Sequence, residues 1–154
     1  MEITQRNANL SDAQTLLDWR NHPDIRKFSK QPEIIPVHEH LKWFGERLKK
    51  VQHEPFYLFE SHHKVIGICR LDRVLGPPGK FELSILVDPD QHSNGIGTKI
   101  LDMSCKSFFS AHPHESIIAI VKKENLLSKK LFLKAGFSLR NTIGDFLYFE
   151  KELN

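Results

Sequence analysis

A glycine pair follows an apolar stretch near the middle of the chain, and this combination could bind an anion. The stretch Phe81 to Val87 is rich in aromatic and β-branched residues, which predicts a buried strand. Gly95 and Gly97 come next, and apolar residues at three- and four-residue spacings predict a helix from about Ile96. The first N–H groups of a helix have no partner within it, and glycine lets the backbone approach a ligand. The pattern predicts a site for a ligand that carries phosphate.

The spacing disfavours the two best-known phosphate loops. A dinucleotide-binding loop has a third glycine and, about 20 positions later, an acidic residue. A nucleotide P-loop has Lys followed by Ser or Thr, whereas Gly97 is followed by Thr98 and then Lys99. Taken alone, the glycine pair could also be a helix start that binds nothing.

A second segment, from Asn125 to Phe137, favours a ligand site over a helix start that binds nothing. Together with the glycine pair it resembles the GNAT superfamily of acetyl-CoA-dependent N-acetyltransferases. In that family the loop after the fourth strand is roughly Q/R-x-x-G-x-G/A, and a later helix is roughly N-x-x-A/S-x-x-L/F-Y-x-x-x-G-F. This chain departs from the helix motif at Phe132, where the family has tyrosine. The matching positions are Asn125, Ser128, Leu131, Gly136 and Phe137.

The resemblance implies a fold and a co-substrate. The implied fold class is α/β (α+β): a single mixed, mostly antiparallel, twisted sheet flanked by helices, with central parallel strands that splay apart. We expect residues 1–154 to form one acetyltransferase domain. Acetyl-CoA is expected in the splay, and a small-molecule amine is expected as the acceptor.

The resemblance also implies which residues hold acetyl-CoA. The pantetheine arm is expected to pair with the main chain at Leu86 and Val87. His92 stands where the family has Gln or Arg, but backbone amides carry most of the pyrophosphate contact. The expected loop and helix residues are His92, Ser93, Asn94, Gly95, Ile96, Gly97 and Thr98. The expected contacts from the later helix are Asn125, Ser128 and Phe132.

Glu82 is the expected general base. Direct acetyl transfer needs a neutral amine, so a proton must be removed from the acceptor. Glu82 is the acidic residue within the predicted central strand, where the family often places a catalytic glutamate. A surface-facing strand glutamate is the alternative.

Phe132 leaves the proton donor open. In many family members the tyrosine of the motif protonates the leaving thiolate, and phenylalanine cannot donate a proton. The thiolate could leave without an acid, Tyr148 or a water could serve, or the protein could bind acetyl-CoA without efficient catalysis. We expect one of the first two, because loss of a general acid costs about 100- to 10,000-fold rather than all activity.

The acceptor side is indicated by the sequence W-R-N-H-P at residues 19–23. It resembles one GNAT branch, which acetylates ribosomal-protein N-termini or UDP-linked 4-amino-sugars in the pseudaminic acid pathway. We expect Arg20, Asn21, His22 and Phe28 at the acceptor. Two structural alternatives are that Arg20 pairs with a carboxylate and that His22 caps a helix.

Two classes of function follow from these residues. The first is an enzyme acting on a UDP-linked amino-sugar or, as runner-up, on a protein N-terminus. The second is a non-catalytic acetyl-CoA-binding module. A sugar nucleotide predicts a closed, basic and aromatic pocket near Arg20 and Phe28, whereas a peptide predicts an open groove with acidic residues near the amine.

The remaining elements must hold these segments in place. Ser11 is predicted to cap a first helix, with Gln14 reaching back. That helix should end near Asn21, and a short one can restart at Asp24 after Pro23. The other predictions are a first strand at 2–6, a helix at 38–50, hairpin strands at 55–61 and 64–74, a turn at 76–79, a buried strand at 116–122 and a last strand at 145–152.

Composition sets broad limits. A net charge of +3 over 154 residues is too small to indicate a nucleic-acid-binding protein. No apolar run approaches the roughly 20 residues of a membrane span. The two cysteines, Cys69 and Cys105, are expected to be reduced and near the core of a cytoplasmic protein. The nine histidines lack the spacing of a zinc site. Monomer and homodimer both stay open.

Overall fold

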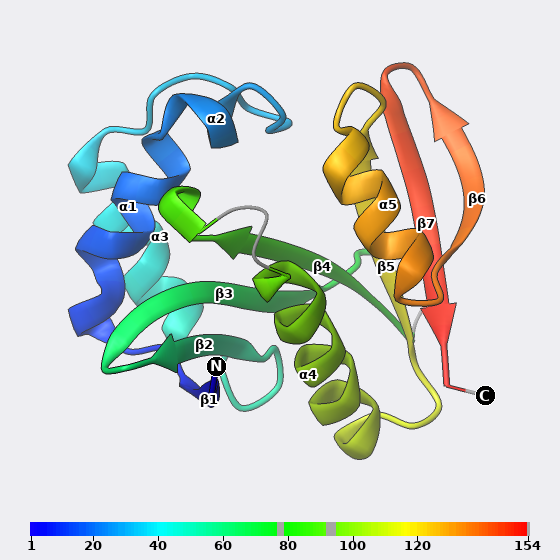
Figure 1. The fold of residues 1–154 in the computed structure, drawn as a ribbon, viewed down its shortest axis with the longest axis horizontal. Coiled ribbons are helices and arrows are strands. Elements are labelled where there is room, and N and C mark those ends of the chain that lie inside the picture. Colours follow the sequence, from blue (N-terminus) through cyan, green and yellow to red (C-terminus); the bar gives the residue numbers. More distant parts are fainter. Residues whose placement is uncertain (77–78, 92–94, 154) are drawn as a thin grey trace.

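One seven-stranded sheet organises the chain in the computed structural model, which describes residues 1–76, 79–91 and 95–153 (Figure 1). The strand order is β1-β2-β3-β4-β5-β7-β6. Neighbouring strands are antiparallel except β4 and β5, which run parallel, so the expected mixed sheet is confirmed. The strands are β1 (Thr4–Asn7), β2 (Phe56–Ser61), β3 (Lys64–Arg73), β4 (Lys80–Val87), β5 (Ser116–Lys122), β6 (Ser138–Ile143) and β7 (Phe146–Glu152).

Helices cover both faces of the sheet (Figure 1). On one face α1 and α3 pack against β2 and β3, with Trp19 and Phe44 in that core. On the other face α4 and α5 cover the centre of the sheet, with Phe108 and Phe132 among the core residues. The helical segments are η1 (Leu10–Asp12), α1 (Ala13–Asn21), α2 (Pro23–Arg26), α3 (Val37–Leu48), η2 (Pro89–Gln91), α4 (Ile96–Ala111) and α5 (Leu126–Lys134).

The parallel strands separate partway along β4. Within the described residues, pairing of β4 with β5 ends at Glu82, opposite Ile118. On its other edge β4 stays paired with β3 as far as Val87. The last part of β4 therefore has one paired edge and one open edge, which is the splay that the resemblance implied.

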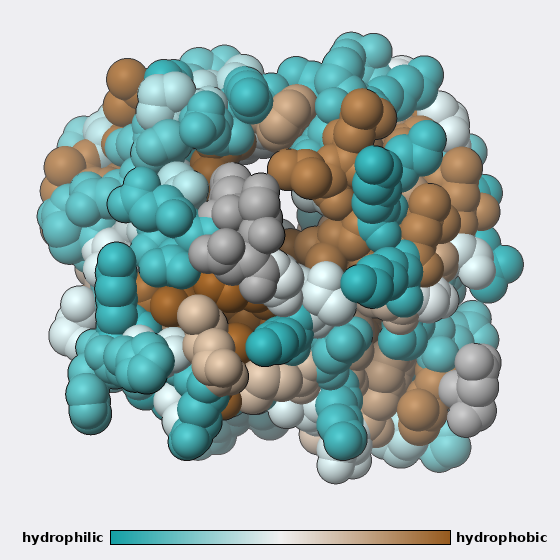
Figure 2. All heavy atoms as spheres, in the orientation of Figure 1, coloured by the Kyte–Doolittle hydropathy of each residue, from teal (hydrophilic) through white to brown (hydrophobic). Residues whose placement is uncertain are grey.

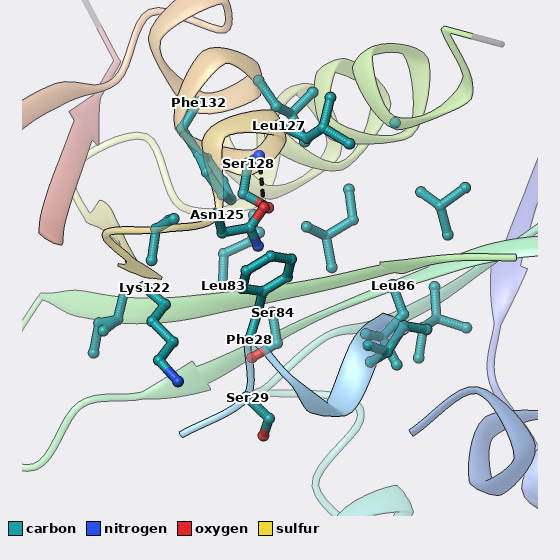
Figure 3. Close-up of a pocket in the computed structure, with 18 of the residues that line it drawn as sticks. Phe28, Ser29, Leu83, Ser84, Leu86, Lys122, Asn125, Leu127, Ser128 and Phe132 are labelled. Carbon is teal, nitrogen blue, oxygen red and sulfur yellow. Dashed lines mark hydrogen bonds between the residues drawn. The ribbon is translucent and has the colours of Figure 1, made fainter. Parts of the chain in front are cut away.

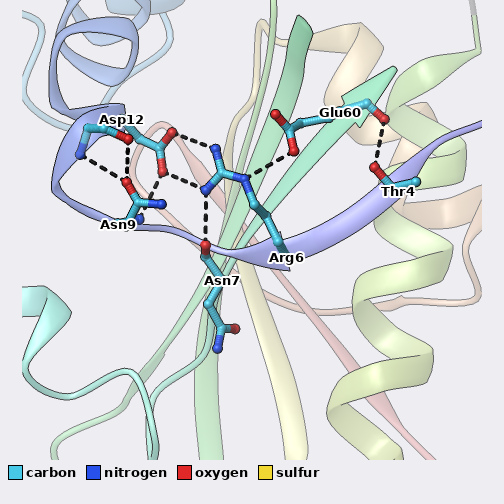
Figure 4. A network of polar contacts seen from close by, with 7 residues as sticks. Thr4, Arg6, Asn7, Asn9, Asp12 and Glu60 are labelled. Atoms are coloured by element: carbon cyan, nitrogen blue, oxygen red, sulfur yellow. Dashed lines mark hydrogen bonds and ion pairs between the residues drawn. The ribbon is translucent and has the colours of Figure 1, made fainter. Parts of the chain in front are cut away.

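The start of the first helix differs from the prediction (Figure 4). Asn9, not Ser11, is the cap: its side chain accepts from the Ser11 N–H at 2.9 Å, and its own N–H donates to Asp12 at 2.8 Å. Arg6 also donates to both oxygens of Asp12, at 2.8 and 2.9 Å. A short 3-10 turn precedes α1, so the reciprocal capping pair lies two residues earlier than the Ser11–Gln14 pattern indicated.

The edge strand β6 was not predicted. All six of its residues are exposed, so it lacks the alternation of buried and exposed positions that marks a strand in sequence. The hairpin of β2 and β3 was predicted to within a residue at each end, and its turn consists of His62 and His63. Both have a left-handed backbone, with φ of 51° and 63°. Residues 77 and 78 of the predicted turn lie outside the described residues.

The structure also bears on the predictions about membrane spans and cysteines. Within the described ranges, no helix is long and apolar enough to cross a membrane. Cys69 and Cys105 are both buried, as expected, and neither forms a disulfide.

Candidate active site

A cavity of ≈ 930 Å³ lies where β4 and β5 diverge. Its walls come from the second half of β4, the start of α4, α5 and the segment that follows α2 (Figure 3). Figure 2 shows the molecule hollowed near the centre of this face, with hydrophobic residues along one side of the hollow. The cavity thus joins the glycine pair, the second motif and the open edge of β4.

The open edge of β4 exposes the main chain of alternate residues. Two hydrogen bonds, one at each end of β4, show that the N–H and C=O groups of its even-numbered residues point toward β3. By alternation, Ile85 and Val87 direct their N–H and C=O groups into the cavity. Val87 was expected there, but the main chain of Leu86 faces β3 and it is the Leu86 side chain that lines the cavity. The two bonds run from Asp88 N–H to Ile66 C=O at 2.9 Å and from Val74 N–H to Lys80 C=O at 3.0 Å.

The start of α4 supplies backbone donors that have no partner within the helix. Gly95 is the N-cap residue and has φ of 73°, a left-handed backbone that suits glycine. The first bond of the helix runs from Lys99 N–H to the Gly95 carbonyl, at 3.3 Å. The N–H groups of Ile96, Gly97 and Thr98 therefore have no helical partner, and all three residues line the cavity. The other expected loop residues, His92, Ser93 and Asn94, lie outside the described residues.

The second motif begins α5 at the cavity wall. Asn125 is the N-cap residue, and its side chain accepts from the Ser128 N–H at 3.2 Å (Figure 3). Both residues line the cavity. A Cβ on Gly97 would lie 3.7 Å from the side chains of Leu131 and Val87. These are ordinary van der Waals distances, so α4, α5 and β4 meet at Gly97 with room for a Cβ.

Phe132 belongs both to the core and to the cavity wall. Its side chain is 3% exposed, meets the edge of Phe137 at 5.0 Å between ring centroids and stacks on Phe149 at 6.3 Å. Tyr148, the other suggested proton donor, does not line the cavity. It alternates with the core residue Phe149 on β7 and so faces away from Phe132. The structure offers no support for Tyr148 as the acid.

Glu82 lies at the closed end of the splay and lines the cavity, so it is not simply a surface-facing strand residue. Its Oε2 is 2.6 Å from the Nζ of Lys30, which lies in the segment after α2. This ion pair was not predicted from the sequence. No local pattern could have found it, because the partners come from distant segments.

Arg20 lies in the half of the cavity next to α1 and α3. Its guanidinium is 4.5 Å from the ring centroid of Trp43, and it donates to Nδ1 of His40 at 3.2 Å. Burial and, to a lesser extent, the positive charge of Arg70 together lower the pKa of Arg20 to about 10. Arg70 lies over the same Trp43 ring at 5.1 Å. No described carboxylate pairs with Arg20, so the alternative prediction of such a pair is wrong.

Among the other residues expected at the acceptor, the structure brings only Phe28 into the cavity (Figure 3). Asn21 instead ties the chain together, donating to the Ile35 carbonyl at 3.0 Å and accepting from the Ile35 N–H at 2.8 Å. His22 accepts from the Asp24 N–H at 3.1 Å and caps α2, which confirms the structural alternative for that residue. Neither residue lines the cavity.

Comparison with known proteins decides the family. The family model described as an acetyltransferase (GNAT) domain matches residues 3–138. The chain belongs to the GNAT acetyltransferase family. It is 27% identical over 140 residues to acetyltransferase PseH of Campylobacter jejuni subsp. jejuni serotype O:2, a match that covers 91% of this chain and 85% of that protein.

Solved structures share the GNAT fold. The putative acetyltransferase yncA from Salmonella typhimurium, solved with its cofactor acetyl-CoA, has a TM-score of 0.82, with 18% identity and coverage of 100% and 95% of the two chains. RimL, a ribosomal L7/L12 α-N-protein acetyltransferase solved with coenzyme A, has a TM-score of 0.84, with 13% identity and coverage of 98% and 94%. At these identities the likeness is one of fold.

Membership of the GNAT family makes this chain an acetyl-CoA-dependent N-acetyltransferase, with an amine acceptor as the second substrate. The described residues also have the chemical groups that acetyl-CoA binding requires. Ile85 and Val87 offer a strand edge that pairs with no described strand, and the start of α4 offers N–H groups that have no partner within the helix. Lys130 and Lys134 of α5 add positive charge to the wall of the cavity.

Proposed function

We propose that this GNAT enzyme acetylates the primary amine of a UDP-linked 4-amino-sugar. The observation that carries the proposal is Arg20, a guanidinium without a described carboxylate partner, held against Trp43 in the cavity. A guanidinium is well suited to phosphate oxygens. Such a group favours an acceptor that brings its own negative charge.

The charge of the cavity wall agrees with an anionic acceptor. Among the described residues, seven basic ones line the cavity, against two acidic ones, Asp24 and Glu82. Two of the basic residues, Lys130 and Lys134, lie on α5 beside the expected cofactor, and Lys30 and Arg70 are paired with Glu82 and Asp72. A peptide N-terminus would instead favour acidic residues around its amine. The basic residues are Arg20, Lys27, Lys30, Arg70, Lys122, Lys130 and Lys134.

Phe28 provides the aromatic surface expected for a sugar nucleotide. Its ring lies within the cavity between β4 and the start of α5 (Figure 3). An aromatic face can pack against a sugar ring or a nucleobase. A basic and aromatic cavity is what the sequence analysis expected for this acceptor, not the acidic groove expected for a peptide.

The likeness to PseH supports the same branch. The match to the relative named acetyltransferase PseH covers 91% of this chain. The W-R-N-H-P sequence at residues 19–23 resembles the branch that includes both the amino-sugar and the ribosomal-protein N-terminal acetyltransferases. The RimL likeness is one of fold, so it adds no comparable support for a ribosomal acceptor. Acetylation of a protein N-terminus therefore stays an outcome of the test below.

Each wall of the cavity has a proposed task. Ile85 and Val87 pair with the pantetheine arm, while the N–H groups that begin α4 bind the pyrophosphate. The side chain of Leu86 shapes the floor between cofactor and acceptor. Glu82 takes the proton from the acceptor amine. Because the Phe132 side chain cannot donate a proton, the thiolate leaves unassisted or takes a proton from water.

The test measures thiol release from acetyl-CoA by the purified protein with two sets of acceptors. One set contains UDP-linked 4-amino-sugars, and the other contains short peptides with free N-termini. We expect thiol release with the sugars. Release with the peptides alone would move the assignment to protein acetylation, and release with neither would refute both acceptor classes.

A further inference from the structure

The Lys30 amine occupies the position at Glu82 that an acceptor amine needs. Its Nζ is 2.6 Å from Oε2 of Glu82, and both side chains line the cavity. Glu82 is the last residue of β4 that pairs with β5, so its carboxylate lies where the open edge begins. A primary alkylammonium bound to this carboxylate has the same chemistry as a substrate amine.

The segment that carries Lys30 is held on both sides. On the near side, Lys122 of β5 donates from Nζ to the Lys27 carbonyl at 3.3 Å. On the far side, Ile35 is bonded twice to Asn21 of α1. Between these points residues 28–31 line the cavity, so Lys30 is presented to Glu82 of its own molecule.

Lys30 also keeps the freedom that a nucleophile requires. Its side chain is 51% exposed, so the amine is not locked in a dry environment. A lysine side chain has a flexible four-carbon stem and carries a compact ammonium group. The amine can therefore leave the carboxylate and turn toward the open edge of β4 without unfolding the segment.

We propose that Lys30 is a self-acetylation site, which accepts the acetyl group when no other amine fills the cavity. The proposal rests on the role of Glu82 as base given under the proposed function, and it is independent of the amino-sugar as acceptor. Nothing in the GNAT match or in the name of the relative assigns this activity to the chain.

The step balances without a further reactant. The Glu82 carboxylate takes one proton from the Lys30 ammonium, and the nitrogen lone pair attacks the thioester carbonyl carbon. The carbon–sulfur bond breaks and the thiolate leaves, while nitrogen loses its second proton. One of the two protons ends on the thiolate and the other in solvent. The products are Nε-acetyl-Lys30 and free coenzyme A.

The chain contains a matched control amine. Lys49, the C-cap residue of α3, pairs with Glu46 at 3.1 Å, and both side chains are exposed and lie outside the lining of the cavity. Lys49 thus has a carboxylate neighbour but no cavity. Chemical acetylation by acetyl-CoA in solution would label Lys49 as readily as Lys30.

The experiment incubates the full chain with isotopically labelled acetyl-CoA and no acceptor, and measures label at each lysine by mass spectrometry. We expect Lys30 to be labelled about 100-fold faster than Lys49, because a positioned base contributes at least that factor. The rate per molecule should not depend on protein concentration. Equal rates at Lys30 and Lys49, or a rate that rises with protein concentration, would overturn the proposal.

Two variants separate the base from the acceptor. Glu82→Gln should reduce labelling of Lys30 to the rate of Lys49, with acetyl-CoA binding checked by calorimetry. Lys30→Arg keeps a positive charge opposite Glu82 and should abolish label at this position. Unchanged labelling of Lys30 in Glu82→Gln would contradict the mechanism.

The acceptor assay on the same preparation distinguishes this proposal from the proposed function. Label at Lys30 without turnover of sugars would refute only the acceptor class. Turnover of sugars without label at Lys30 would refute only self-acetylation.

Discussion

The hydrogen bond from Arg20 to His40 keeps the His40 ring neutral. Nη1 of Arg20 lies 3.2 Å from Nδ1 of His40, and Nε2 of the same ring lies 2.8 Å from the Ala13 carbonyl oxygen. A guanidinium can only donate and a carbonyl can only accept, so His40 carries its proton on Nε2 and is neutral. The His40 residue is fully buried. A neutral histidine thus positions the guanidinium that we assign to the acceptor.

This relationship predicts a pH dependence of stability. Burial lowers the pKa of His40 below 6.5; the Ala13 hydrogen bond opposes that change and the Arg20 charge adds to it. The unfolded chain therefore takes up this proton at a higher pH than the folded chain. The contribution of His40 to the free energy of unfolding is complete above about pH 6.5 and declines as the pH falls below that value.

His40→Gln tests this dependence, because glutamine can accept from Arg20 and donate to Ala13 without titrating. Thermal unfolding should show a steeper loss of Tm in the wild type than in the variant between about pH 7 and pH 5. Parallel curves for the two proteins would show that His40 does not contribute.

Glu82→Gln should lower kcat by about 100- to 10,000-fold, because glutamine cannot accept the proton of the acceptor amine. Binding of acetyl-CoA should be preserved, since the cofactor contacts come from the main chain. Glu60→Gln is the control: Glu60 pairs with Arg6 at 3.0 Å, and neither residue lines the cavity. A similar loss of kcat in both variants would point to a general defect in folding.

Phe132→Tyr should keep or raise turnover, because it restores the hydroxyl of the family motif at the wall of the cavity. The ring also packs against Phe137 and Phe149. Steady-state rates and Tm should therefore be measured together. A large loss of turnover with a lowered Tm would show that packing, not proton donation, determines this position.

The cofactor side of the site was more accessible to sequence analysis than the acceptor side. Gly95 and Gly97 act through their own backbone, and Asn125 caps the helix that begins next to it, so short motifs contain these features. Whether Ile85 or Leu86 faces the cavity depends on the register with β3, which no motif encodes.

The acceptor side depends on contacts between distant segments. Lys30 meets Glu82 only because the segment after α2 folds back to line the same cavity as β4. Arg20 and Arg70 meet at Trp43 because α1, α3 and β3 pack together. The residue types of these groups are visible in the sequence, but their grouping comes from tertiary packing.

The turn between β2 and β3 offers a test of stability away from the site. His62 and His63 both have positive φ, which costs a residue with a Cβ roughly 1 kcal/mol or more. Asn followed by Gly is the preferred pair for such a two-residue turn. Replacing both histidines with Asn-Gly should raise the free energy of unfolding by about 1 kcal/mol, measured by urea denaturation. An unchanged or lowered midpoint would show that the histidines have compensating contacts.

The central claim is that Arg20 recognises the negative charge of a nucleotide-linked acceptor. The most direct measurement compares kcat/KM for a UDP-linked 4-amino-sugar and for the same sugar without UDP, in the wild type, in Arg20→Gln and in the surface control Arg140→Gln. We predict that Arg20→Gln loses about 10- to 100-fold with the UDP-linked sugar and little with the free sugar, while Arg140→Gln changes neither. An equal loss with both sugars, or no loss with either, would contradict the assignment.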